Sequence, residues 1–306
     1  MKIFKPKFWN DNNMISVLLL PFTFITTIVN FIKKNQKKYK TVIPTICVGN
    51  IYLGGTGKPQ LVIKLNEILK TKFKTYVIKK KYEDQVDEQK LLEKKTNLIL
   101  PKKRLDGLKK IQNLKKSIAI FDDGLQDKSI NYTLSIVCFS SLAGFGNKKL
   151  IPAGPLRESL NELKNYDAIF INGKENYLLT NDLKKHNKKI KIFYGKYILK
   201  NKKDLDIKSG YLAFCGIGTP QNFFQLLKEN KIKVQKKIIF PDHYEYSHTD
   251  ITEIIQKAKK DKLKIVTTEK DFMKIKKFGK NKIKFTNVDL KVKNYSEFNK
   301  FLYNYI

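Results

Sequence analysis

A glycine-rich stretch at residues 48–58, "VGNIYLGGTGK", holds the residue types that bind a phosphate group. A strand-forming run precedes it, and apolar residues at helical spacing follow it in "QLVIKLNEILK". In a turn between a buried strand and a helix, backbone N–H groups and the helix amino terminus converge on phosphate oxygens, and a lysine reaches the terminal phosphates. The stretch therefore predicts a nucleotide-binding loop made of Gly54, Gly55, Thr56, Gly57 and Lys58.

The residue after the lysine departs from the complete phosphate-loop pattern. That pattern has Ser or Thr at this position, and the chain has Pro59. The change removes the hydroxyl that usually binds magnesium and one N–H of the phosphate cradle, although proline is well tolerated in the first turn of a helix. Two interpretations stay open: a nucleotide loop that holds its ion differently, or a tight glycine turn with a lysine there by chance.

Two carboxylates complement the glycine loop. Asp122 and Asp123 follow the apolar run "SIAIF", so they stand at the carboxyl end of an expected buried strand. Open parallel sheets gather their ligands at this edge, and a carboxylate there holds magnesium directly or through water. Because Asp and Gly also favour turns, "DDG" alone is equally compatible with a turn that has no function. Together with the glycine loop it predicts a magnesium site.

The formal net charge of +34 comes almost entirely from lysine. Such a charge favours an anionic partner, but the lysines are spread along the chain and aromatic residues are not interleaved with them, which argues against nucleic-acid binding. The two arginines, Arg104 and Arg157, are then candidates for binding phosphate or carboxylate, because a guanidinium offers a planar fork of donors. His243 follows Asp242 in "FPDHYEYSHTDI" and is a candidate for proton transfer, although a lone histidine is more often structural.

An apolar segment precedes the loop. Residues 14–32, "MISVLLLPFTFITTIVNFI", carry no charge, and a basic run from Lys33 to Lys40 follows. The segment is just long enough to span a bilayer, but Pro21 and the threonines also suit a helix in the interface, with the lysines on anionic headgroups. We expect a membrane-associated helix within residues 1–36, shallow insertion being favoured over a span. The alternative is a buried core helix, apolar on all sides. The lysines place the body on the cytoplasmic side.

From residue 41, β-branched runs alternate with lysine-rich helical stretches, which is the pattern of an α/β protein with a mainly parallel sheet. A chain of 306 residues exceeds the usual size of a single core, so two lobes are expected. We expect a P-loop nucleotide-binding domain at residues 37–175 and a smaller α/β lobe at 176–306. The expected strands are 41–48, 75–80, 97–100, 117–123, 134–139, 167–173, 191–198, 211–218, 233–240, 263–268 and 282–288.

Six motifs occur in order behind the apolar segment: "VGNIYLGGTGK", "FDDGLQ", "GFGN…IPAGPLRE", "GIGTPQNFF", "DHYEYSHTDI" and "TEKD". In this order they resemble the tetraacyldisaccharide 4′-kinase family of lipid A synthesis, over roughly residues 9–275. The pair "DDGLQ" and "PAGPLRE" is much more specific than the glycine loop. The family is similar in architecture to P-loop NTPases, with a mainly parallel sheet flanked by helices and a second, smaller α/β lobe.

The resemblance implies an enzyme that uses ATP and Mg²⁺. It would transfer the γ-phosphoryl group to the 4′-hydroxyl of an acylated glucosamine disaccharide 1-phosphate lipid. It would work at the cytoplasmic face of the bacterial inner membrane, which it would reach through the N-terminal helix. No nucleic acid and no obligate protein partner is expected.

The resemblance also implies roles for residues that match its motifs. Lys58 would contact the β- and γ-phosphates, and Asp122 and Asp123 would hold or position the metal. Arg104 matches, weakly, a basic residue of the family. Arg157 is a candidate on the residues alone: the Gly- and Pro-rich loop at 145–158 would present it to an anionic group of a substrate.

A proton-transfer pair is implied in the same way. The family's acidic "GDE" motif matches Val86-Asp87-Glu88 without its glycine, which makes Asp87 the candidate base. The family's "DH" histidine matches His243, which would support that base.

Three departures from the family pattern bear on the metal geometry. Pro59 stands where the family has a magnesium-contacting Thr, the family's "RGYG" is "KKYE" here, and the segment before Asp87 is shortened. Pro59 keeps open the alternative of a degenerate, inactive kinase. A second alternative is a membrane-associated P-loop ATPase that acts as a switch.

Overall fold

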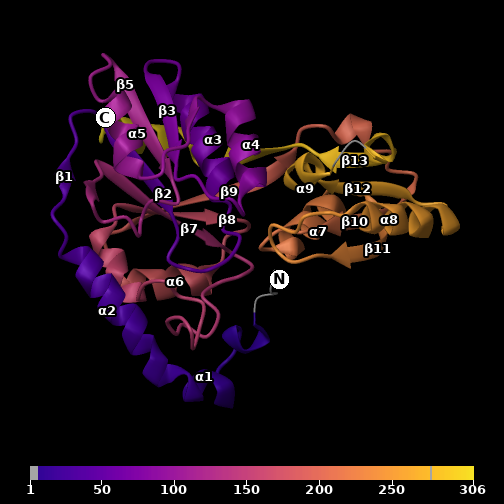
Figure 1. Cartoon of the computed structure of the whole chain (residues 1–306), viewed down its shortest axis with the longest axis horizontal. Coiled ribbons are helices and arrows are strands. Elements are labelled where there is room, and N and C mark those ends of the chain that lie inside the picture. The colour runs from indigo at the N-terminus through magenta and orange to yellow at the C-terminus, as the bar shows by residue number, and fades with distance from the viewer. Residues whose placement is uncertain (1–5, 276–277) are drawn as a thin grey trace. The chain divides into compact units, whose positions relative to one another are not determined.

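A computed structural model describes residues 6–275 and 278–306 (Figure 1). The contacts between described residues divide the chain into two compact units. The larger holds residues 6–81, 95–196 and 292–306, and the smaller holds 82–94 and 197–291. This division differs from the boundary expected after residue 175. The chain enters the smaller unit for residues 82–94, returns to the larger one, and ends there after a second excursion, so a single cut in the sequence does not separate the units.

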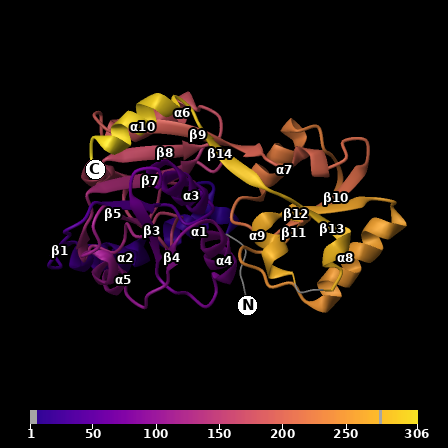
Figure 2. The ribbon, with the colours of Figure 1, turned by 90° about the horizontal axis from the view of Figure 1, so that it is seen from above.

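An eight-stranded sheet has the order β14-β9-β8-β7-β2-β5-β3-β4, and all neighbouring pairs from β9 to β4 are parallel (Figure 2). Most of it belongs to the larger unit, but residues 197–199 of β9 and 288–291 of β14 are assigned to the smaller unit. A separate parallel pair joins β1 (Tyr39–Lys40) to β6 (Ile130–Asn131). Six strands of the eight-stranded sheet, β2, β3, β4, β5, β7 and β8, match those expected in the first lobe, whereas β9, expected in the second lobe, also joins this sheet and β14 was not expected. Its members are β2 (Thr45–Gly49), β3 (Lys74–Lys79), β4 (Leu98–Ile99), β5 (Ser117–Asp122), β7 (Leu134–Ser140), β8 (Ala168–Asn172), β9 (Lys191–Leu199) and β14 (Val288–Val292).

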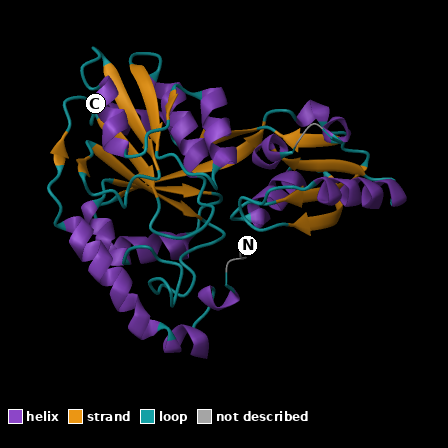
Figure 3. Ribbon diagram, viewed as in Figure 1, coloured by secondary structure: helices purple, strands orange, loops and turns teal. Residues whose placement is uncertain are grey.

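Helices cover both faces of this sheet (Figure 3). The central strands β2, β5, β7 and β8 are buried at every position, as their continuous apolar sequences predict. On β8, Ile169 and Ile171 pack into the cluster that includes α5 (Arg104–Ile111) and α6 (Tyr177–His186). Between them Phe170 points the other way, with its ring centroid 5.8 Å from that of Phe298 in α10 (Tyr295–Tyr303). The expected helix after the glycine loop is α3 (Lys58–Leu69).

The N-terminal apolar segment is helical but broken. It consists of η1 (Lys7–Trp9), α1 (Met14–Leu18), η2 (Leu20–Phe22) and α2 (Thr23–Lys34), with Pro21 in the 3-10 turn between the two α-helices. No residue of α2 is buried, so the alternative of a buried core helix is wrong. Within residues 6–275 and 278–306, no helix has both the length and the apolar character needed to cross a bilayer.

The smaller unit has a four-stranded parallel sheet in the order β11-β10-β12-β13. Alternate residues of β10 face opposite helices: Leu212 and Phe214 pack with α8, and Tyr211 and Ala213 pack with α7. The strands are β10 (Gly210–Cys215), β11 (Lys233–Ile239), β12 (Lys264–Thr268) and β13 (Ile283–Thr286), and the helices are α4 (Val86–Lys95), α7 (Pro220–Glu229), α8 (His248–Lys260) and α9 (Glu269–Lys274). Short 3-10 turns complete the fold at η3 (Leu160–Asn165), η4 (Lys202–Asp204) and η5 (Lys280–Lys282).

Candidate active site

The glycine loop joins β2 to α3 and is held by buried amide side chains. Gly57 caps α3 with a φ of 83°, in the left-handed region that favours glycine. Asn50 Nδ2 donates to the carbonyl of Gly54 and to Thr56 Oγ1, each at 3.2 Å. Asn172, at the end of β8, donates to the carbonyl of Thr56. These contacts fix the turn at the amino end of a helix, where a phosphate is favourably bound.

The segment "IPAGPLRE" lies against the glycine loop. The N–H of Leu53 donates to the carbonyl of Pro155, and the N–H of Arg157 donates to the carbonyl of Ile51, both at 2.8 Å. Two backbone hydrogen bonds therefore join the glycine loop to this family-specific segment. This pairing places the side chain of Arg157 at the carboxyl edge of the sheet.

Asp123 is the point at which the predicted residues of the larger unit meet. Lys58 Nζ lies 3.4 Å from Asp123 Oδ1, and Arg157 Nη1 donates to the same oxygen at 3.0 Å. Arg104 Nη2 donates to the main-chain carbonyl of Asp123 at 2.6 Å. Lys58 thus lies beside the acidic turn, and both arginines of the chain contact one aspartate.

The cations around Asp123 govern its ionisation. Burial alone would raise the pKa of its carboxyl group, but Lys58, followed by Arg157, Lys79 and Arg104, lowers that pKa to about 2. Asp123 is therefore an anion across the physiological range, with its charge already shared among cationic side chains.

Asp122 has a partner that the sequence analysis did not predict. Lys79 Nζ donates to Asp122 Oδ2 at 2.7 Å, and the two side chains are 1% and 0% exposed. Lys79 ends β3 and Asp122 ends β5, at paired positions of neighbouring strands. A lysine near the end of the strand expected at 75–80 was the available signal, but which residue it pairs with depends on the order of the strands in the sheet.

The acidic turn suits a magnesium ion that is held mainly by a nucleotide. Among the described residues, no three His, Cys, Asp or Glu side chains gather as a complete protein-made metal site would require. Mg²⁺ commonly keeps several waters and is held by one or two carboxylates together with substrate phosphates. The carboxylates of Asp122 and Asp123, beside the glycine loop, fit that second arrangement.

The predicted proton-transfer pair is formed within the smaller unit. His243 Nδ1 lies 2.8 Å from Asp87 Oδ1, and the Asp87 side chain is 1% exposed. Asp87 comes from the first turn of α4, and His243 follows β11 with a φ of 57°. Residues 156 positions apart in the sequence thus meet as expected from the motifs.

Two lysines of α9 hold the second oxygen of Asp87. Lys270 Nζ lies 3.5 Å and Lys274 Nζ 3.8 Å from Asp87 Oδ2. Lys270 also contacts Glu88 at 3.0 Å, and Lys274 contacts Asp271 at 2.7 Å. Burial alone would raise the pKa of Asp87, but Lys270, His243 and Lys274 hold it well below its usual range. The carboxylate is ionised, so the ring of His243 donates to it.

A cavity of about 510 Å³ opens onto this pair. Charged and polar side chains line it together with apolar ones such as Val86 and Met273. Its lining includes Glu83, Asp84, Val86, Asp87, Lys90, His243, Glu245, Tyr246, Ser247, Met273 and Lys274.

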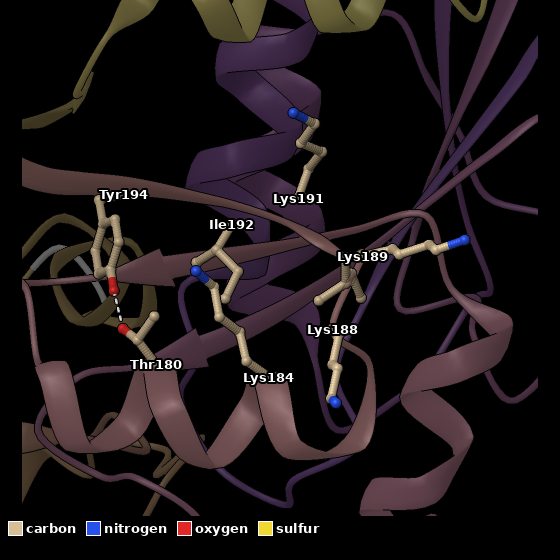
Figure 4. Close-up of a pocket in the computed structure, with 8 residues that line it drawn as sticks. Thr180, Lys184, Lys188, Lys189, Lys191, Ile192 and Tyr194 are labelled. Atoms are coloured by element: carbon tan, nitrogen blue, oxygen red, sulfur yellow. Dashed lines mark hydrogen bonds between the residues drawn. The ribbon is translucent and has the colours of Figure 1, made fainter.

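A second cavity, of about 360 Å³, lies between α6 and β9 in the larger unit. It is lined by lysines, but the ammonium groups of Lys188, Lys189 and Lys191 point in three different directions (Figure 4). They do not converge on a common point, as a phosphate site would require.

A glycine loop between a buried strand and a helix, with carboxylates at the end of the adjacent parallel strand, defines a P-loop α/β nucleotide-binding protein. The family profile of "LpxK: Tetraacyldisaccharide-1-P 4′-kinase" matches residues 15–306, and the chain belongs to this family. It is therefore a kinase.

Individual relatives agree with this assignment. The chain is 45% identical over 297 residues to the tetraacyldisaccharide 4′-kinase of Pelagibacter ubique, covering 95% of each protein. It is 33% identical over 314 residues to the enzyme of the same name from Rickettsia typhi, covering 96% of each. A crystal structure of "apo" form LpxK from Aquifex aeolicus in complex with ATP has the same fold, with a TM-score of 0.70, 24% identity and coverage of 95% of this chain and 99% of that one.

Proposed function

We propose that this kinase transfers the γ-phosphoryl group of ATP to the 4′-hydroxyl of a tetraacylated glucosamine disaccharide 1-phosphate, a step of lipid A synthesis. The observation that carries the proposal is the position of Lys58, which starts α3 at the glycine loop and lies 3.4 Å from Asp123 at the end of β5. An ammonium group, a helix amino terminus and carboxylates at one sheet edge are what a metal–triphosphate requires.

The larger unit binds the nucleotide in this proposal. Residues 54–57 surround the phosphates, Lys58 contacts the β- and γ-phosphates, and Arg157 and Arg104 stabilise the negative charge of a substrate. Asp122 and Asp123 hold magnesium directly or through water. When bound, the ion neutralises charge on the phosphate oxygens during transfer.

The smaller unit supplies the proton acceptor. The acceptor's 4′ oxygen forms a bond to the γ-phosphorus, the bond from that phosphorus to the bridging oxygen of ADP breaks, and the hydroxyl proton passes to Asp87. The lowered pKa of Asp87 makes it a weak base. A weak base suffices, because phosphoryl transfer has a loose transition state in which positioning and charge neutralisation dominate. His243, which donates to Asp87 Oδ1, keeps the carboxylate in place.

The N-terminal helices bring the enzyme to the inner membrane surface in this proposal. The apolar residues of α1, η2 and α2 that are more than half exposed are Met14, Ile15, Val17, Leu18, Phe22, Phe24, Ile25, Phe31 and Ile32. Lys33 and Lys34 end α2, and Lys37, Lys38 and Lys40 follow. Apolar area beside basic side chains is the combination that binds an anionic lipid surface. An acylated acceptor is present at that surface.

A lipid-acceptor assay tests the proposal against a P-loop ATPase switch and an inactive kinase. Purified protein is incubated with radiolabelled ATP, Mg²⁺ and the disaccharide 1-phosphate lipid in detergent. We expect label in the lipid, and a loss of at least about 100-fold with Lys58→Ala, because that side chain stabilises the transferred group. Label released only as inorganic phosphate, at a rate independent of the lipid, would support the switch. No turnover of either kind would support the inactive kinase.

A further inference from the structure

Lys79 is a buried ammonium group next to the predicted magnesium carboxylates. Its Nζ lies 2.7 Å from Asp122 Oδ2, and neither side chain is more than 1% exposed. The two residues are paired across the parallel strands β3 and β5. A single charge buried here would be strongly destabilising, so each member of the pair requires the other.

The pair limits what the acidic turn can offer to a free cation. One oxygen of Asp122 is bonded to Lys79, and Asp123 Oδ1 is shared by Lys58 and Arg157. Three cationic side chains therefore contact the two carboxylates. Each repels a divalent cation that approaches without phosphates.

The chain also lacks a hydroxyl where a P-loop usually has one. Pro59 is buried in the first turn of α3, so the residue after Lys58 offers neither a hydroxyl ligand nor an N–H. With this ligand absent and the carboxylates paired, the protein alone is a poor site for Mg²⁺.

We propose that Lys79 is a positioning residue that fixes Asp122 and supplies permanent positive charge beside it, so that the enzyme binds Mg²⁺ only together with the triphosphate. The inference rests on the proposed function, in which Asp122 meets the metal of a metal–nucleotide complex. The triphosphate supplies negative charge that balances Lys58, Lys79 and Arg157. Without the triphosphate, the charge of Lys79 prevents a free Mg²⁺ ion from binding at the acidic turn.

The experiment measures Mg²⁺ binding to the nucleotide-free, full-length protein, by thermal shift and titration calorimetry at constant ionic strength. Wild type should show no binding below millimolar Mg²⁺. Lys79→Met and Lys79→Gln should bind Mg²⁺ alone at least about tenfold more tightly, because a charge next to the carboxylate is gone. Lys74→Met is the matched control: it removes the same charge from the exposed start of the same strand and should leave Mg²⁺ binding as in wild type.

The double variant Lys79→Met with Asp122→Asn distinguishes an effect of charge on Mg²⁺ affinity from an effect of an unpaired buried charge on folding. It removes both buried charges, so it should fold even where Lys79→Met does not, and it should lose any gain in Mg²⁺ affinity. Tight binding of free Mg²⁺ by wild type, or folded Lys79→Gln without a gain, would overturn the inference. These measurements need no turnover. A wild type that fails to phosphorylate the lipid therefore contradicts the proposed function and leaves the result on Lys79 intact.

Discussion

At the scale of single residues, Asp123 is the common counter-ion of the cationic side chains beside the glycine loop. Lys58 and Arg157 contact its carboxylate, and Arg104 contacts its main-chain carbonyl. Without this anion, positive side chains at one sheet edge would repel one another in the absence of nucleotide. Asp123 therefore stabilises the empty site as well as positioning its lysine.

The lowered pKa of Asp123 predicts a specific dependence of stability on pH. A carboxyl group whose pKa falls from 3.8 in the unfolded chain to about 2 in the folded one stabilises the fold above the unfolded value. That stabilisation is lost as the pH falls through about 2. At pH 5 the unfolding free energy of wild type should exceed that of Asp123→Asn. This difference should be about 1 kcal/mol smaller at pH 3. Urea melts at both pH values measure it, and a pH-independent difference would contradict the assignment.

Pro59 permits a test of the inactive-kinase alternative. Pro59→Thr restores an N–H and a hydroxyl in the first turn of α3. We expect kcat to rise by no more than about fivefold, since one added hydrogen bond contributes ~1 kcal/mol. The lipid-acceptor assay measures this gain. An increase of several orders of magnitude from nearly zero would show instead that the natural chain has decayed.

At the scale of elements, α2 has two faces with different tasks. Thr26 donates to the carbonyl of Ile151 at 2.6 Å, and Asn30 donates to the carbonyl of Arg157 at 2.8 Å. The four-residue spacing places both on one side of the helix, against the loop that carries Arg157. The exposed apolar residues lie on the rest of the surface, so α2 is attached through a polar stripe and leaves its apolar side chains exposed.

This arrangement predicts that a charged side chain on the apolar face of α2 weakens membrane binding without affecting nucleotide binding. Ile25→Asp and Ile32→Asp replace side chains that are 61% and 58% exposed. Each should lower binding to anionic phospholipid vesicles about tenfold or more, because burying an Ile side chain contributes ~1.5–3 kcal/mol. Nucleotide binding should not change. Ile207→Asp, at a 45% exposed position in the smaller unit, is the matched control in vesicle co-sedimentation. Equal loss in all three variants would exclude a specific role for α2.

The elements also show what the sequence could predict. The glycine loop and the acidic turn were found because each lies in one short segment, directly after a strand with continuous apolar residues. The roles of Asn172 and Lys79 were not predicted because each contacts a residue next to a different strand: Asn172 contacts Thr56, and Lys79 contacts Asp122. The spacing of residues along the chain does not reveal which strands are neighbours in the sheet. The pairing of Asp87 with His243 was expected only through the family motifs, since 156 positions separate the two residues.

At the scale of the whole molecule, the candidate site residues belong to two different compact units. Lys58, Asp122 and Asp123 lie in the larger unit, and Asp87 and His243 lie in the smaller one. The sequence could not predict this division, because residues 82–94 lie between strands of the larger unit in the chain and yet pack in the smaller unit. The candidate base, Asp87, is therefore held by Lys270 and Lys274 of α9, whereas the glycine loop is held by Asn50 and Asn172.

This division predicts that nucleotide binding and phosphoryl transfer can be lost separately. Asp87→Asn removes the proton acceptor and leaves residues 54–58 unchanged, so the Kd for Mg·ATP should stay within about twofold of wild type while kcat falls at least about 100-fold. Lys58→Ala should weaken Mg·ATP binding and lower kcat together, because the lysine contacts phosphates in the ground state as well as in the transition state. Calorimetric titration with a non-hydrolysable ATP analogue, beside the lipid-acceptor assay, measures both quantities. Near-normal turnover by Asp87→Asn would remove Asp87 as the base and leave the nucleotide half of the proposal standing.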